Sequence, residues 1–228
     1  MATEDCAVTA AVRTMSKRPT PAPRTFRDKV VAQFGRPTGV VGRLVGFVLA
    51  TRPSNRERNR RTVELLQIRE TDRVLEIGFG PGLAIEMAAQ LARRGKVVGI
   101  DHSEVMLRRA SQRNAAAIAA GRVELHLASA EAPPASTEPF DKVMASNVHM
   151  FLQEPVSALG RWLAVMRPGG LIAITHQSRK QGATDADSAS GAERIAADLR
   201  AAGFTEVRME TLEMKPVNAA CVLARRPG

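Results

Sequence analysis

Short apolar runs alternate with longer amphipathic stretches over the last two thirds of the chain. Runs such as 73–78 and 96–101 have the length of strands and are apolar enough to be buried on both faces. The stretches between them carry apolar residues at helical spacing. This alternation, followed by two strands in succession, predicts an α/β fold. We expect a doubly wound, mainly parallel seven-stranded sheet with an antiparallel C-terminal strand, and additional N-terminal helices.

The pattern also gives bounds for the elements. The predicted strands are 73–78, 96–101, 122–127, 140–147, 171–176, 204–214 and 217–224. The predicted helices are 55–69, 83–94, 103–119, 154–166 and 191–202. Ser103 is the expected N-cap of its helix, and Pro168-Gly169-Gly170 is expected to form a turn before the fifth strand.

Three regions follow from these patterns. Residues 1–27 mix Thr, Ala, Pro and Arg without periodicity, which predicts a disordered basic tail. Residues 28–69 are expected to form an N-terminal helical cap, and 70–228 the main domain. The apolar segment 40–50 in the cap is too short to span a bilayer. It can be a lid over a substrate, an element on a membrane surface, or a helix packed on the core.

Composition limits the functional classes. The net charge is +10, but residues 1–61 hold 13 basic and 4 acidic side chains, so the remainder is close to neutral. The basic character therefore belongs to the N-terminal part, which can attract phosphates or an anionic membrane surface, or be a solvated tail. Nucleic acid is the less favoured partner because Tyr is absent and Trp162 is the only tryptophan for base stacking, whereas peripheral membrane contact stays open. The two cysteines lie far apart without metal-ligand spacing, so we expect no metal site and a cytoplasmic location.

The most informative stretch is 74–82, which reads Val-Leu-Glu-Ile-Gly-Phe-Gly-Pro-Gly. It predicts a buried strand, a tight glycine turn and the start of a helix. Gly78, Gly80 and Gly82 allow positive φ and the close approach of a ligand. The dinucleotide fingerprint would require a third glycine at position 83, which is leucine. Glu76 would repel a pyrophosphate but can steady a cationic group.

A second acidic residue ends the next predicted strand. Asp101 lies 19 residues beyond Gly82, where a carboxylate can accept both hydroxyls of a ribose. Glycine turn, early acid and ribose acid together resemble the class I S-adenosylmethionine-dependent methyltransferases, which have a Rossmann-like fold. The similarity covers roughly residues 70–225 and is greatest to small bacterial enzymes related to ubiquinone and menaquinone C-methyltransferases.

This resemblance implies S-adenosyl-L-methionine as the cofactor and a set of residues that hold it. In it, Asp101 binds the ribose, and the segment 129–131 lies beside the adenine. The implied cofactor-binding residues are Glu76, Gly78, Phe79, Gly80, Gly82, Asp101, His102, Ala130, Glu131 and Asn147.

One histidine is a candidate general base. His149 follows the fourth predicted strand, on the carboxyl side of the sheet, and histidine titrates near neutral pH. The alternative is a loop histidine packed against a helix. We expect a small-molecule acceptor for O-, N- or C-methylation. The alternatives are RNA or another polyanion bound by Arg56, Arg58, Arg60 and Arg61, and a cofactor-binding module without turnover.

Overall fold

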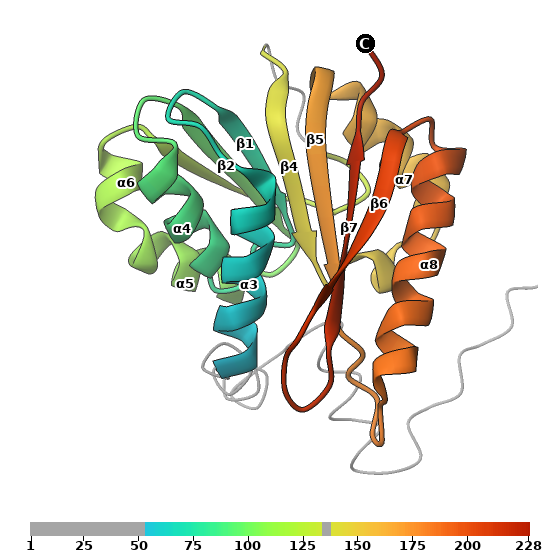
Figure 1. The fold of residues 1–228 in the computed structure, drawn as a ribbon. Coiled ribbons are helices and arrows are strands. Elements are labelled where there is room, and N and C mark those ends of the chain that lie inside the picture. Colours follow the sequence, from blue (N-terminus) through green and yellow to red (C-terminus); the bar gives the residue numbers. More distant parts are fainter. Residues whose placement is uncertain (1–52, 134–137) are drawn as a thin grey trace, which may run out of the picture.

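The computed structural model describes residues 53–133 and 138–228 (Figure 1). The expected tail, 1–27, and the part of the expected cap before residue 53 lie outside the described residues. Of that cap, the structure describes one helix and the loop that follows it.

The elements form a three-layered α/β domain. The strands are β1 (Arg73–Ile77), β2 (Lys96–Asp101), β3 (Val123–Leu127), β4 (Phe140–Ser146), β5 (Met166–His176), β6 (Thr205–Leu212) and β7 (Ala219–Arg225). The helices are α3 (Pro53–Leu66), α4 (Leu83–Leu91), α5 (Glu104–Arg113), α6 (Ala115–Ala119), the 3-10 turn η1 (His149–Phe151), α7 (Pro155–Ala164) and α8 (Asp185–Ala201).

The sheet has seven strands in the order β3-β2-β1-β4-β5-β7-β6. The first five strands in this order are parallel to one another, and β7 runs antiparallel to both β5 and β6. The predicted fold class is therefore confirmed. Chain order reverses between β1 and β4, and in open α/β sheets ligands bind beyond the carboxyl ends of strands at such a point.

Two apolar layers bury the two faces of the sheet. One contains residues of α3, α4 and α5, and the other contains residues of α7 and α8 (Figure 1). Alternate strand residues supply the two layers, as the pleat requires. Val143 and Ile172 face α7 and α8, whereas Met144 and Ala173 face α3 and α4.

The predicted helix 103–119 is wrong in one respect, because it is two helices that meet at Asn114. The side-chain amide of Asn114 donates to the carbonyl oxygens of Ala110 and Gly82, at 2.9 and 3.1 Å. A side chain that bonds the main chain competes with the helix, and here it also fastens the break to the glycine turn. The predicted N-cap of this helix is confirmed, since the Ser103 hydroxyl accepts a hydrogen bond from the Met106 amide.

The other elements differ from their predicted bounds by three residues or fewer, except in two places. The expected turn 168–170 lies inside β5, where the pairing with β4 shifts register and Gly169 has φ +74°. It is thus a bulge rather than a turn before the strand. Helix α8 begins at Asp185, earlier than the predicted residue 191, because the Asp187 carboxylate accepts from the Thr184 amide and caps it.

Candidate functional site

The glycine turn after β1 has one open position and two crowded ones. All three glycines have positive φ, between +53° and +77°. A Cβ on Gly78 would lie 2.4 Å from Val148 Cγ2, and one on Gly82 would lie 2.7 Å from Ala110 Cβ. A Cβ on Gly80 would meet no atom within 4 Å. Gly78 and Gly82 therefore serve packing, whereas Gly80 borders space that a ligand can fill.

This contrast predicts different effects of alanine at the two positions. Gly78→Ala adds a steric overlap of about 1–3 kcal/mol to the left-handed strain of about 1–2 kcal/mol. Gly80→Ala carries only the strain, and its methyl group fills the open space. We expect urea unfolding to show the larger loss of stability for Gly78→Ala. Gly80→Ala should instead lose ligand affinity while it stays folded; equal destabilisation of the two variants would contradict this assignment.

Glu76 is a buried carboxyl group without a full set of partners. Its side chain is 3% exposed, and Oε2 has no hydrogen-bond partner. Burial above all, and then the nearby charge of Asp101, raise its pKa well above the ordinary value, against a hydrogen bond from the Ile85 amide. A buried oxygen of this kind is costly unless a donor meets it. The site therefore has an acceptor ready for a cationic or N–H-bearing ligand.

Asp101 ties the turn to the end of β2. Its Oδ2 accepts from the Gly80 amide and its Oδ1 from the Ser103 amide, each at 2.9 Å. Each carboxylate oxygen has further acceptor capacity, so hydroxyl groups can still bind. His102 lies beside it, with Nδ1 3.7 Å from Asp101 Oδ1 and the side chain 58% exposed. The structure thus brings Asp101 and Gly80 into direct contact, with Glu76 close enough for the charge of Asp101 to raise its pKa.

The segment after β3 is held against α7. The Ala130 carbonyl accepts from Trp162 Nε1 at 2.8 Å. The Glu131 carboxylate accepts from the Gln153 amide at 2.7 Å, ahead of α7. Glu131 therefore has a structural partner that sequence patterns did not indicate.

Two predicted site residues direct their side chains elsewhere. Phe79 is 3% exposed, and its ring packs over Gly99, where a Cβ would lie 2.8 Å from Phe79 Cδ1. The Asn147 amide group exchanges hydrogen bonds of 2.8 and 3.2 Å with the Gln177 main chain. Asn147 therefore clamps the ends of β4 and β5. At Phe79 and Asn147, a ligand could therefore be bound by the main chain rather than by the side chain.

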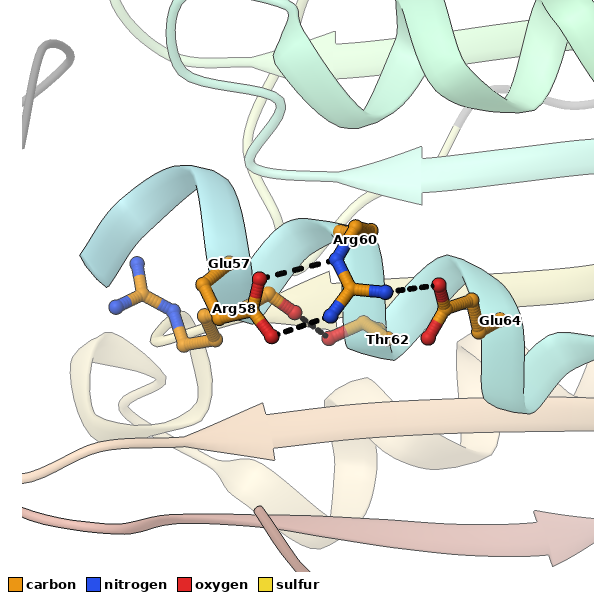
Figure 2. A network of polar contacts seen from close by, with 5 residues as sticks. All are labelled: Glu57, Arg58, Arg60, Thr62 and Glu64. Atoms are coloured by element: carbon orange, nitrogen blue, oxygen red, sulfur yellow. Dashed lines mark hydrogen bonds and ion pairs between the residues drawn. The ribbon is translucent and has the colours of Figure 1, made fainter. Parts of the chain in front are cut away.

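Sequence patterns did not single out Arg58 among the arginines of α3. Its side chain is 4% exposed and donates to Ser146 Oγ, Gln177 Oε1 and Asn55 Oδ1, at 2.8, 2.9 and 2.6 Å. Arg60, by contrast, is exposed and lies between Glu57 and Glu64 (Figure 2). Helical periodicity separates the inner from the outer arginine, but only the sheet beneath α3 supplies the partners of Arg58.

A cavity of about 530 Å³ opens at the carboxyl end of the sheet, and its wall includes Gln177, which accepts from Arg58. Its wall is made by Ser54 of α3, the segment after β5, and Pro216 and Val217 between β6 and β7. Gln177 joins this wall to α3 and to the β6–β7 connection, because it accepts from Arg58 and donates to the Val217 carbonyl at 2.8 Å. The cavity is large enough for a small molecule.

His149 lies in η1 and faces α8. Its Nε2 is 2.8 Å from Asp198 Oδ2, and its side chain is 12% exposed. His176, at the end of β5, packs over Gly191 of α8. Burial, followed by the charges of Arg194, His149 and Arg58, lowers the pKa of His176. Over the described ranges 53–133 and 138–228, no group of three or more His, Cys, Asp or Glu side chains could hold a metal ion.

Comparisons with known proteins agree with this geometry. Residues 74–170 match the family model described as a methyltransferase domain. The uncharacterized methyltransferase YdaC of Bacillus subtilis is 29% identical over 185 residues, 81% of this chain and 99% of YdaC. The ubiquinone/menaquinone biosynthesis C-methyltransferase UbiE of Geobacter sulfurreducens is 31% identical over 53% of this chain. The chain spans nearly all of YdaC but 47% of UbiE.

The chain belongs to the class I S-adenosylmethionine-dependent methyltransferases. It is an enzyme of this family, and S-adenosyl-L-methionine is its cofactor. The fold agrees with that of the N-methyltransferase NodS of Bradyrhizobium japonicum in complex with S-adenosyl-L-homocysteine. That structure has a TM-score of 0.62 and 20% identity, and the alignment covers 79% of this methyltransferase and 91% of NodS. Within the described residues, no helix has the length and apolarity to cross a bilayer.

Proposed function

We propose that this methyltransferase holds its cofactor across the glycine turn and methylates a small-molecule acceptor in the cavity beside α3. The observation that carries the cofactor placement is the pair of carboxyl groups, Glu76 and Asp101, at the two sides of the turn. One has a buried oxygen without a partner, and the other is anchored to the Gly80 amide at 2.9 Å. Gly80 adds the open space between them.

The side chains fit the chemistry of that cofactor. Asp101 can accept from ribose hydroxyls, and Glu76 can balance a cationic group directly or through water. The segment with Ala130 and Glu131 would border the adenine, as the family resemblance implies, and His102 would neighbour the adenosine. When bound, the cofactor would supply an electrophilic methyl group on a sulfonium sulfur, which leaves as a neutral thioether. The protein then has to align the acceptor and exclude water.

The arginines of α3 favour a small acceptor over RNA. A polyanion needs several exposed cations along one face. Arg58 points into the protein, and Arg60 is paired with Glu57 and Glu64. Of the four arginines considered for phosphate contacts, two are thus engaged elsewhere. The cavity beside α3 has the volume of a small-molecule site instead.

The test combines binding and turnover. Calorimetry should show binding of S-adenosylmethionine and S-adenosylhomocysteine to the wild-type protein. A panel of small acceptors should then give methylated product and S-adenosylhomocysteine. Steeply salt-dependent binding of RNA with transfer to it would favour the RNA alternative. Tight cofactor binding without transfer to any acceptor class would favour the module without turnover.

We also propose His149 as the general base. The Asp198 carboxylate can accept a hydrogen bond from a protonated Nε2 of His149. Nδ1 would then be free of its proton and could take one from the methyl acceptor. His149→Gln should then lower kcat by about 100-fold or more with the acceptor found by the panel, and leave cofactor affinity unchanged. The matched control is His126→Gln, since His126 is half-exposed on β3. If His149→Gln lowers the melting temperature but not kcat, His149 only fastens η1 to α8.

We propose a cytoplasmic location on the basis of the cysteines. Cys221 is a free, buried thiol in β7, and burial raises its pKa to about 12. Such a thiol is unreactive and forms no disulfide. Fractionation of the producing cells should place the protein with cytoplasmic markers, and recovery with secreted proteins would contradict this.

A further inference from the structure

Arg58 is a buried cation whose partners are all neutral. The groups that accept from it are an amide oxygen of Asn55, the Ser146 hydroxyl and an amide oxygen of Gln177. Among the residues that the structure describes, no carboxylate lies within ion-pair distance of it. Burying a charge without a counter-ion is costly, so buried arginines are normally paired with an acid. A counter-ion that arrives with a ligand would remove that cost.

The arginine also has donors left for a ligand. A guanidinium carries five N–H groups. Asn55, Ser146 and Gln177 accept one hydrogen bond each, from Nη2, Nε and Nη1 respectively. Within the described part of the chain, each terminal nitrogen therefore keeps one further N–H. Two such groups match the two oxygens of a carboxylate, which arginine binds bidentately.

The cavity that Gln177 borders is lined by positive charges, like that of Arg58 itself. Gln177, which accepts from Arg58, lines it together with Arg179 and Lys180, and none of its described lining residues is acidic. Lys180 Nζ is paired with Asp187 Oδ1 at 2.6 Å. Burial first, and then the charge of Arg179, lower the pKa of Arg58 to about 9. The charge of Arg179 therefore adds to the cost of burying Arg58, and an anion bound beside Arg58 would reduce that cost.

We propose that the methyl acceptor is a small carboxylic acid, whose carboxylate enters this cavity and neutralises Arg58, with Arg179 as the second cation. This rests on the proposed function, because it specifies the acceptor of the same site. A carboxylate suits the depth of Arg58, which is 4% exposed, better than a polymer phosphate, which stays at the surface. The acid group would fix the acceptor at one end and leave the rest of the molecule to present the atom that is methylated.

The test uses pairs of probes of similar shape, in which an ionised carboxylate is replaced by a neutral amide. Benzoate and benzamide, cinnamate and cinnamamide, and succinate and succinamide are titrated into the full chain, with inorganic phosphate as a further probe. Titrations are followed by calorimetry and by ligand-observed NMR, with and without saturating S-adenosylhomocysteine. We expect at least one carboxylate to bind at least tenfold more tightly than its amide and than phosphate.

Variants then locate the charge that is responsible. Arg58→Gln should reduce carboxylate affinity at least tenfold while affinity for S-adenosylhomocysteine stays within threefold. The matched control is Arg60→Gln on the outer face of α3, which should leave both affinities unchanged. If Arg58→Gln does not fold, Arg179→Gln at the cavity wall should weaken carboxylate binding about fivefold.

Several results would overturn the proposal. These are equal affinity for acids and amides, a preference for phosphate over every acid, or acid binding that survives both substitutions. A parallel loss of S-adenosylhomocysteine and carboxylate affinity in Arg58→Gln would also do so, because Arg58 would then serve the carboxylate of the cofactor. If wild-type protein fails to bind S-adenosylhomocysteine, the proposed cofactor placement fails, and the titrations without it still decide the acid preference.

Discussion

Replacing Asp101 by alanine is expected to weaken binding of S-adenosylhomocysteine by about 1–3 kcal/mol, or roughly 5- to 150-fold. Two losses combine in this variant. The ribose hydroxyls lose their acceptor, and the amides of Gly80 and Ser103 lose the carboxylate that positions them, each at 2.9 Å. Calorimetric titration of wild type and variant measures the difference directly.

The control must remove a buried carboxylate that serves the fold alone. Asp72 is 6% exposed and accepts from the Arg69 amide at 2.8 Å, just before β1 and thus at the amino end of the sheet. Asp72→Ala should lower stability and leave affinity for S-adenosylhomocysteine unchanged. If folded Asp101→Ala binds as tightly as wild type, the cofactor does not use the end of β2.

The central strands of the sheet could be predicted from the sequence because they are buried on both faces. Strands such as β1 and β2 read as continuous apolar runs, and β2 was predicted with its observed bounds. The sequence also predicts that Glu76 and Asp101 lie at strand ends, and the structure has them near the end of β1 and at the end of β2. What could be predicted is thus set by local patterns that also determine the backbone.

What the sequence could not give depends on contacts between distant segments. Asn114 breaks a good helical pattern because Gly82, 32 residues earlier, offers it a carbonyl oxygen. Arg58 reads as one of several polar helix residues, yet Gln177, 119 residues later, accepts from it. Neither partner can be identified without the fold. The partners that hold a buried polar side chain therefore appear only in the structure.

Glu76→Gln is expected to change stability and cofactor affinity in opposite directions. Its pKa is raised in the folded protein, so the folded state keeps a proton that the unfolded chain releases. Stability of the wild type therefore falls as pH rises from the ordinary glutamate pKa toward the folded one. Glutamine mimics the protonated group and removes this fall. Without cofactor, the variant should be more stable by about 1–3 kcal/mol at pH 8 and similar to wild type at pH 4.

The same substitution should weaken cofactor binding at least tenfold, because an amide, unlike a carboxyl group, cannot release a proton to balance a cationic group. Thermal unfolding between pH 4 and 8 and calorimetry with S-adenosylhomocysteine measure the two effects. A variant less stable than wild type at pH 8 would show that the ionised carboxylate supports the fold.

A double variant tests the interaction between the two carboxyl groups. The charge of Asp101 contributes to the raised pKa of Glu76. In an Asp101→Ala background, Glu76→Gln should therefore stabilise the protein less. This result would mean that the fold holds two carboxyl groups together although they repel each other, which is a cost that a bound cationic ligand would offset.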